Sequence, residues 1–103
     1  MLERVKLAMR ISTTVYDSEI LSLIIAGIYD IQHAGAQFDY SITTGTGGAI
    51  TDYTIADPLA SQAVVTYCRM MFGSPADFDR LKAAYEMQKG QLRESTKYGM
   101  EAL

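Results

Sequence analysis

The longest helical pattern of apolar positions in the chain lies between Ile20 and Ile31. At about 100° per residue its apolar side chains cover an arc of roughly 180°, well beyond the ~100° stripe of an ordinary surface helix. The arc consists of Ile20, Leu21, Ile24, Ile25, Ile28, Tyr29 and Ile31. Leu23 falls outside it, among polar positions. The pattern predicts a central helix covered on more than one side, either by other segments of this chain or by a neighbouring subunit.

The residues that flank this stretch indicate where the central helix begins and ends. Asp17 is predicted to be its N-cap, and Glu19 in the first turn is favourable to the helix dipole. Ala34-Gly35 supplies a C-terminal stop, so the helix is expected to run to about His33. A shorter amphipathic helix is predicted over residues 2–10, where apolar side chains recur at helical spacing.

Residues 38–56 have a different character, because β-branched, aromatic and glycine residues replace helix formers there. Apolar and polar side chains alternate from Phe38 to Ile42, and residues 50–55 again favour extended structure. The glycine-rich run 45–48 separates the two stretches. These features predict a β-hairpin with a flexible tip, and an irregular long loop is the alternative.

Two further helices are predicted in the second half of the chain. Asp57-Pro58 combines an N-cap with a proline at the first helical position, and Gly73 ends the apolar stripe that follows. Ser74-Pro75 repeats this start signal for a fourth helix, in which Gly90 costs about 1 kcal/mol relative to alanine and favours a bend or fraying. The predicted fold is therefore mainly α, a small bundle of about four helices with a β-hairpin or long loop inserted between helices 2 and 3 at about 38–56.

Length and composition indicate one soluble globular domain. At 103 residues the chain is expected to form a single helical domain over residues 1–95, followed by a flexible C-terminal tail over 96–103. Hydrophobic residues make up 49% of the chain and charged residues 20%, which is not typical of a disordered protein. The longest apolar run, Leu23 to Ala26, is far short of the ~20 residues that cross a bilayer, so we expect no membrane partner. The N-terminus lacks the apolar core of a secretion signal, and a single cysteine suits a reducing cytoplasm.

The charges are unevenly distributed along the chain. No Lys or Arg occurs from Ile11 to Cys68, whereas the acidic residues of this stretch are Asp17, Glu19, Asp30, Asp39, Asp52 and Asp57. An acidic middle repels phosphate and argues against ordinary DNA binding, which needs clustered Lys and Arg. The alternative interpretation is a solvated acidic surface with no role of its own.

The inventory of reactive side chains does not predict catalysis. The chain has one histidine and one cysteine. His33 is too isolated for a metal site, and Cys68 lies on an apolar stripe, where a free cysteine behaves as a small hydrophobe. The glycine run 45–48 lacks the Lys-Ser/Thr end of a phosphate-binding loop. We therefore expect no catalytic residue, no cofactor and no metal, and the protein is not predicted to be an enzyme.

Several segments of the chain together are similar to one known protein family. They are Leu2 to Ile11, Asp17 to Leu21, Asp57-Pro58 with Ala63 to Tyr67, and, as the most specific part, Phe72 to Tyr85 continued by Gln88 to Leu92. These segments cover nearly all of the chain except the hairpin. They resemble the head-tail connector (adaptor) proteins of long-tailed double-stranded DNA bacteriophages. The shared motifs are helix caps and helix faces, so they indicate fold and family better than any single functional residue.

The resemblance implies a structural virion protein that forms a ring between the portal and the tail. Such a ring, twelve-fold by the resemblance, extends the DNA channel and joins head to tail. Its expected partners are other copies of the chain, the portal protein, a tail or stopper protein, and double-stranded DNA that passes without specific binding. The implied location is the head–tail interface of the virion, after assembly in the host bacterial cytoplasm.

Three sets of residues are expected to carry this role. Leu23, Phe78 and Tyr85 are expected at subunit contacts, and Arg93, Lys97 and Tyr98 at the portal. Asp39 and Asp52 are expected to face the channel, where carboxylates would let DNA slide because like charge prevents fixed phosphate contacts.

Two other function classes remain open. A small helical protein-binding regulatory module, acting as a monomer or dimer, predicts a defined low-order oligomer and a partner outside the virion. A nucleic-acid-binding helical domain predicts DNA affinity that falls as salt is raised.

Overall fold

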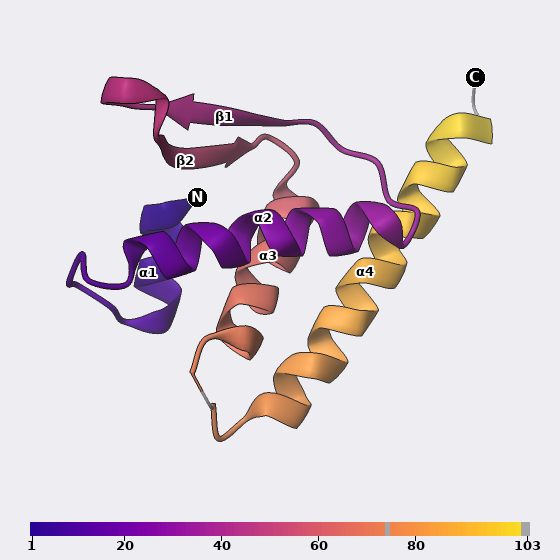
Figure 1. Ribbon diagram of the computed structural model, residues 1–103. Helices are drawn as coiled ribbons and strands as arrows, with labels where there is room; N and C mark the ends of the chain where they lie inside the picture. Colours follow the sequence, from indigo (N-terminus) through magenta and orange to yellow (C-terminus); the bar gives the residue numbers. More distant parts are fainter. Residues whose placement is uncertain (74, 102–103) are drawn as a thin grey trace.

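The computed structural model describes residues 1–73 and 75–101, with the side chains of the last helix described as far as Glu94. In chain order the elements are α1 (Leu2–Met9), α2 (Asp17–His33), β1 (Tyr40–Thr44), the short 3-10 helix η1 (Thr46–Gly48), β2 (Ile50–Ile55), α3 (Pro58–Met71) and α4 (Phe78–Glu101) (Figure 1). The predicted fold class, mainly α with a β-hairpin between the second and third helices, is confirmed.

The helix α2 is the centre of the molecule, as predicted, with the hairpin on one side and α3 and α4 on the other (Figure 1). Four of its isoleucines are completely buried: Ile20, Ile24, Ile28 and Ile31. The arc is therefore covered largely within the chain, by α1, α3 and β2. Tyr29, predicted to lie on the arc, is 59% exposed and forms a hydrogen bond with Tyr40 at the start of the hairpin. The buried arc is narrower than the sequence pattern indicated.

The prediction that Asp17 caps α2 is wrong. Asp17 is the first residue of the helix, Tyr16 occupies the cap position, and no side chain caps the helix. The Asp17 carboxylate turns toward α1 instead, where its Oδ1 lies 2.9 Å from Nζ of the buried Lys6. A buried ammonium group needs a counter-charge more than the exposed amide groups of a helix end need a cap, because water can hydrogen-bond those amides.

The two later helices begin differently. α3 starts where the sequence predicted, because Oδ1 of Asp57 accepts hydrogen bonds from the N–H groups of Leu59 and Ala60. α4 starts only at Phe78, later than the Ser74-Pro75 signal indicated. The chain turns between the helices through Gly73, whose φ of 67° lies in the left-handed region. Ser74 lies outside the described residues.

The helix α4 continues through Gly90 as far as Glu101, so it does not fray at this glycine, and a bend there stays a prediction. The backbone of most of the predicted tail is therefore helical, while residues 102–103 lie outside the described part of the chain. That the segment 96–103 moves independently of the domain stays a prediction.

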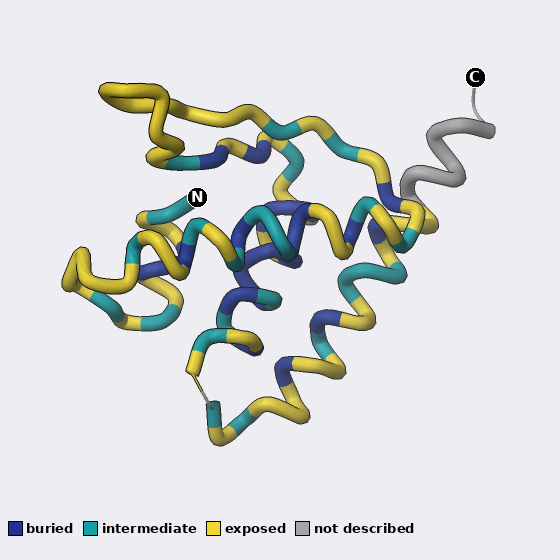
Figure 2. The backbone as a smooth tube through the Cα atoms, viewed as in Figure 1, coloured by how far each residue is buried: buried dark blue, intermediate teal, exposed yellow. Residues whose placement is uncertain are grey.

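The hairpin is an antiparallel pair of strands in which Tyr40 lies opposite Ile55 and Thr44 opposite Ile50. Only the base of β2 is buried, at Tyr53 and Ile55, and the remainder is largely exposed (Figure 2). The connection needs its glycines, because Gly47 and Gly48 have φ values of 77° and 80°. The hairpin prediction is thereby confirmed over the irregular loop.

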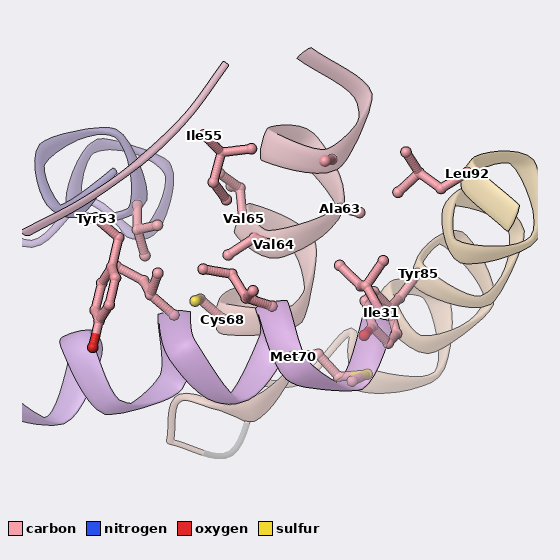
Figure 3. Close-up of a cluster of buried hydrophobic side chains, with 14 of the residues drawn as sticks. Ile31, Tyr53, Ile55, Ala63, Val64, Val65, Cys68, Met70, Tyr85 and Leu92 are labelled. Atoms are coloured by element: carbon pink, nitrogen blue, oxygen red, sulfur yellow. The ribbon is translucent and has the colours of Figure 1, made fainter. Parts of the chain in front are cut away.

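The core lies where α2, α3 and α4 meet, and Tyr53 and Ile55 of the hairpin extend it (Figure 3). The Tyr85 ring packs 5.4 Å from that of Tyr67, and its hydroxyl donates a hydrogen bond to Asp30 at the end of α2. Burial raises the pKa of Tyr85, and the Asp30 carboxylate adds to this effect. Lys89 stands 4.9 Å over the Tyr85 ring and 3.4 Å from Asp30, which further ties α4 to α2.

The molecule is flat, with principal extents of 44 × 37 × 18 Å.

Candidate interaction surfaces

The one cysteine and the one histidine of the chain lie in different surroundings. Cys68 is completely buried, and burial raises the pKa of its thiol to about 12, so the thiol is protonated at neutral pH. His33 is exposed at the end of α2. Among the side chains of residues 1–73 and 75–94, no group of three or more His, Cys, Asp or Glu could hold a metal ion.

Two of the residues predicted at subunit contacts have very different surroundings. Phe78 is 40% exposed at the start of α4, close to Met71, which is 47% exposed at the end of α3. Together with Met70, Gly73 and Pro75 they line an open pocket of about 430 Å³. Tyr85, in contrast, is 2% exposed and is held inside the subunit by Asp30. We therefore leave Tyr85 out of the proposed contact surface.

Leu23, the third residue predicted at subunit contacts, is partly buried and packs against the core. Its side chain thus finds partial cover within the subunit, even though the sequence pattern places it among polar positions. Because part of the Leu23 side chain stays accessible, its role in a contact between subunits stays a prediction.

The residues predicted to meet the portal lie toward the end of α4. Arg93 is exposed, and its side chain passes alongside Gly35 at the end of α2, where a Cβ atom would stand 3.4 Å from Cγ of Arg93. The side chains of Lys97 and Tyr98 lie outside the described residues.

The two carboxylates predicted to face the channel differ in their exposure and in their hydrogen bonds. Asp39 is exposed beside the end of α2, where it lines an open pocket of about 520 Å³ with Gln32 and Phe38. Asp52 has partners, because its Oδ1 accepts hydrogen bonds from the backbone N–H groups of Leu2 at 2.9 Å and of Tyr53 at 2.7 Å. The Met1 amino group lies 3.3 Å from the same oxygen. Asp52 therefore joins α1 to the hairpin, which is a structural role.

Burial alone would raise the pKa of Asp52, but the hydrogen bonds from Leu2 and Tyr53 and the nearby Met1 ammonium outweigh it and lower the pKa. A carboxylate with a lowered folded-state pKa contributes stability above its unfolded pKa of about 3.9, and this contribution is lost as the pH falls through the folded-state pKa. Asp52→Asn is expected to lower the free energy of unfolding by about 1 kcal/mol at pH 7 and to have much less effect near pH 3. Urea unfolding at the two pH values measures the difference. The exposed Asp39→Asn is the matched control, and an Asp52→Asn effect that is equal at both pH values would contradict this role for the charge.

Exposed apolar side chains lie in separate regions of the surface. One region is the hairpin, with Ile42 49% and Ile50 44% exposed. Another is the turn between α3 and α4, where Met71 and Phe78 lie. The connection between α1 and α2 carries Val15, which is 78% exposed. The subunit thus presents more than one apolar surface to possible partners.

No helix in the described part of the chain is long and apolar enough to cross a membrane.

Comparison with known proteins identifies the family. A family model described as "Phage connector protein" matches residues 1–99, including the hairpin, which the sequence resemblance did not cover. Searches of curated proteins and of solved structures found no match to the chain. The match covers nearly the whole chain and agrees with its mainly helical fold, and the chain therefore belongs to the phage connector protein family.

Proposed function

We propose that the chain forms a homo-oligomeric ring between the portal and the tail of a long-tailed phage, where it extends the DNA channel and joins head to tail. Membership of the phage connector family supports a structural role in the virion. The observation that carries the proposal further is the presence of two separate exposed apolar regions, the hairpin with Ile42 and Ile50 and the turn with Met71 and Phe78, because a subunit of a larger assembly can bury such regions against its neighbours.

The distribution of exposed apolar groups supports a ring. Contacts between two different surfaces of identical subunits are head-to-tail, and such contacts close into a ring when the rotation between neighbours allows it. The hairpin and the turn between α3 and α4 are two such different surfaces. A twelve-fold ring is what the family resemblance implies.

The acidic middle of the chain supports passage of DNA without binding. Asp39 is the exposed carboxylate of the hairpin region, and no Lys or Arg occurs from Ile11 to Cys68. A channel lined by such a surface repels phosphates and does not hold DNA in fixed contacts. We place Arg93, Lys97 and Tyr98 of α4 at the portal, and a tail or stopper protein on the opposite face of the ring. The ring then belongs to the head–tail interface of the virion and assembles in the host cytoplasm.

Phe78→Glu is expected to prevent ring assembly while leaving the subunit folded, because Phe78 is 40% exposed and a charge there opposes burial against a neighbour. Native mass spectrometry, alone and with purified portal, measures assembly, and circular dichroism measures folding. Ala83→Glu adds the same charge at another exposed position of α4 and is expected to assemble normally. Rings formed equally well by Phe78→Glu and by the wild-type chain would remove Phe78 from the contact surface.

A further inference from the structure

The outer edge of β1 is an unused hydrogen-bonding surface. The sheet has two strands, and within the residues described no third strand pairs with it. An isolated pair of strands is marginally stable in water, and unpaired N–H and C=O groups along an edge are a template for another strand.

The contacts of Tyr53 show which backbone groups point outward. Its N–H donates to Oδ1 of Asp52, and its carbonyl accepts a hydrogen bond from the Met1 amino group at 3.1 Å, so both groups point away from β1. Ile42 lies directly opposite Tyr53. In an antiparallel ladder, the backbone N–H and C=O groups of two opposite residues either hydrogen-bond to each other or all point away from the partner strand. Because those of Tyr53 point away from β1, the N–H and C=O of Ile42 point away from β2. No hydrogen bond to either group occurs among the described residues.

The two edges of the hairpin are not equivalent. At Tyr53 the start of α1 covers the edge of β2, whereas the edge of β1 stays open. Exposed edge strands usually carry Lys, Pro or inward-pointing charges that prevent pairing with another chain. Residues 40–51 contain no charged residue and no proline, and all of β1 except Tyr40 is exposed. The sequence therefore leaves this edge free to pair.

We propose that the β1 edge pairs with β2 of a neighbouring copy, at the exposed tip end around Ile50 and Thr51, so that a β-sheet continues across the subunit boundary. This inference rests on the proposed ring, which would set identical hairpins at equal spacing around one axis. The neighbouring copy fits because uncharged strands approach one another without like-charge repulsion.

A proline at position 42 tests pairing at the β1 edge without disturbing the hairpin itself. Ile42→Pro removes an outward N–H and leaves the ladder between β1 and β2 intact, because proline is tolerated at such positions of edge strands. Ile42→Thr also loses the apolar side chain but keeps the N–H group, and it is the matched control. We expect Ile42→Pro to stay folded and to assemble about tenfold more weakly with portal present, and Ile42→Thr to assemble like the wild type.

Hydrogen exchange of the wild-type chain supplies a test without substitution. Amides of residues 40–44 that exchange rapidly in the free subunit are expected to become protected in the ring. Equal assembly by Ile42→Pro, or unchanged exchange of this segment in rings that do form, would overturn the shared sheet while the ring itself stands. Failure of the wild-type chain to assemble with portal would overturn the ring and the shared sheet together.

Discussion

Replacing Asp17 by asparagine is expected to lower the free energy of unfolding by about 3 kcal/mol, because it leaves a buried charge without a partner. The Lys6 side chain is 7% exposed, and its Nζ lies 2.9 Å from the Asp17 carboxylate. The ion pair connects α1 to the first turn of α2. Asparagine keeps the shape of the side chain and removes only the charge, so the measured loss reports on the unpaired ammonium group.

Two further variants complete this experiment. Glu19→Gln removes a charge from the same first turn at an exposed position and is expected to change the free energy of unfolding by less than about 0.5 kcal/mol. The double variant Lys6→Met, Asp17→Asn is expected to recover much of the loss, because an apolar side chain replaces the buried ammonium group. Urea unfolding of all three variants gives the free energies. An Asp17→Asn variant as stable as Glu19→Gln would show that the pair does not hold α1 against α2.

Gly27→Ala is expected to destabilise the protein by about 1–2 kcal/mol, although alanine favours a helix over glycine by about 1 kcal/mol. Gly27 is buried where α2 meets α3, and a Cβ atom there would lie 2.9 Å from Cδ1 and 3.4 Å from Cβ of Tyr67. Turning the Tyr67 ring about its Cβ–Cγ bond moves Cδ1 but not Cγ, which would lie 3.2 Å from the added Cβ, so ring rotation alone cannot relieve the crowding. The two helices would have to move apart.

Gly90→Ala is the matched control for this substitution. Gly90 lies within α4, and no atom lies within 4 Å of the position that a Cβ would take. Only the higher helix propensity of alanine then acts, and the free energy of unfolding is expected to rise by about 1 kcal/mol. Thermal or urea unfolding measures both variants. A lower free energy of unfolding for Gly27→Ala and a higher one for Gly90→Ala would support the close approach of α2 and α3. A stabilising Gly27→Ala would contradict it.

The parts of the fold that local chemistry determines could be predicted from the sequence. Asp57-Pro58 begins α3 because the cap and the proline act within one turn, and the glycines of the hairpin adopt the φ values that only glycine readily takes. The cap of α2 could not be predicted in the same way. Asp17 is a residue type that often caps helices, but its carboxylate forms an ion pair with Lys6 of α1 instead.

The candidate surfaces were harder to predict, because a periodic pattern shows which face of a helix is apolar and not what covers it. Phe78 and Tyr85 share one stripe of α4, yet Phe78 lies at the turn and stays exposed while Tyr85 packs on Tyr67 and Asp30. The role of Asp52 depends on Leu2, which is distant in sequence. No local signal in the sequence indicates such a contact.

The central claim is that copies of this chain form a ring on the portal. Native mass spectrometry and electron microscopy of the wild-type chain mixed with purified portal test it most directly, because the portal can serve as a template for subunits that are monomeric alone. We expect one closed ring of connector subunits on each portal. A chain that stays monomeric or dimeric at high concentration, and that the portal does not capture, would contradict the claim and favour a small binding module.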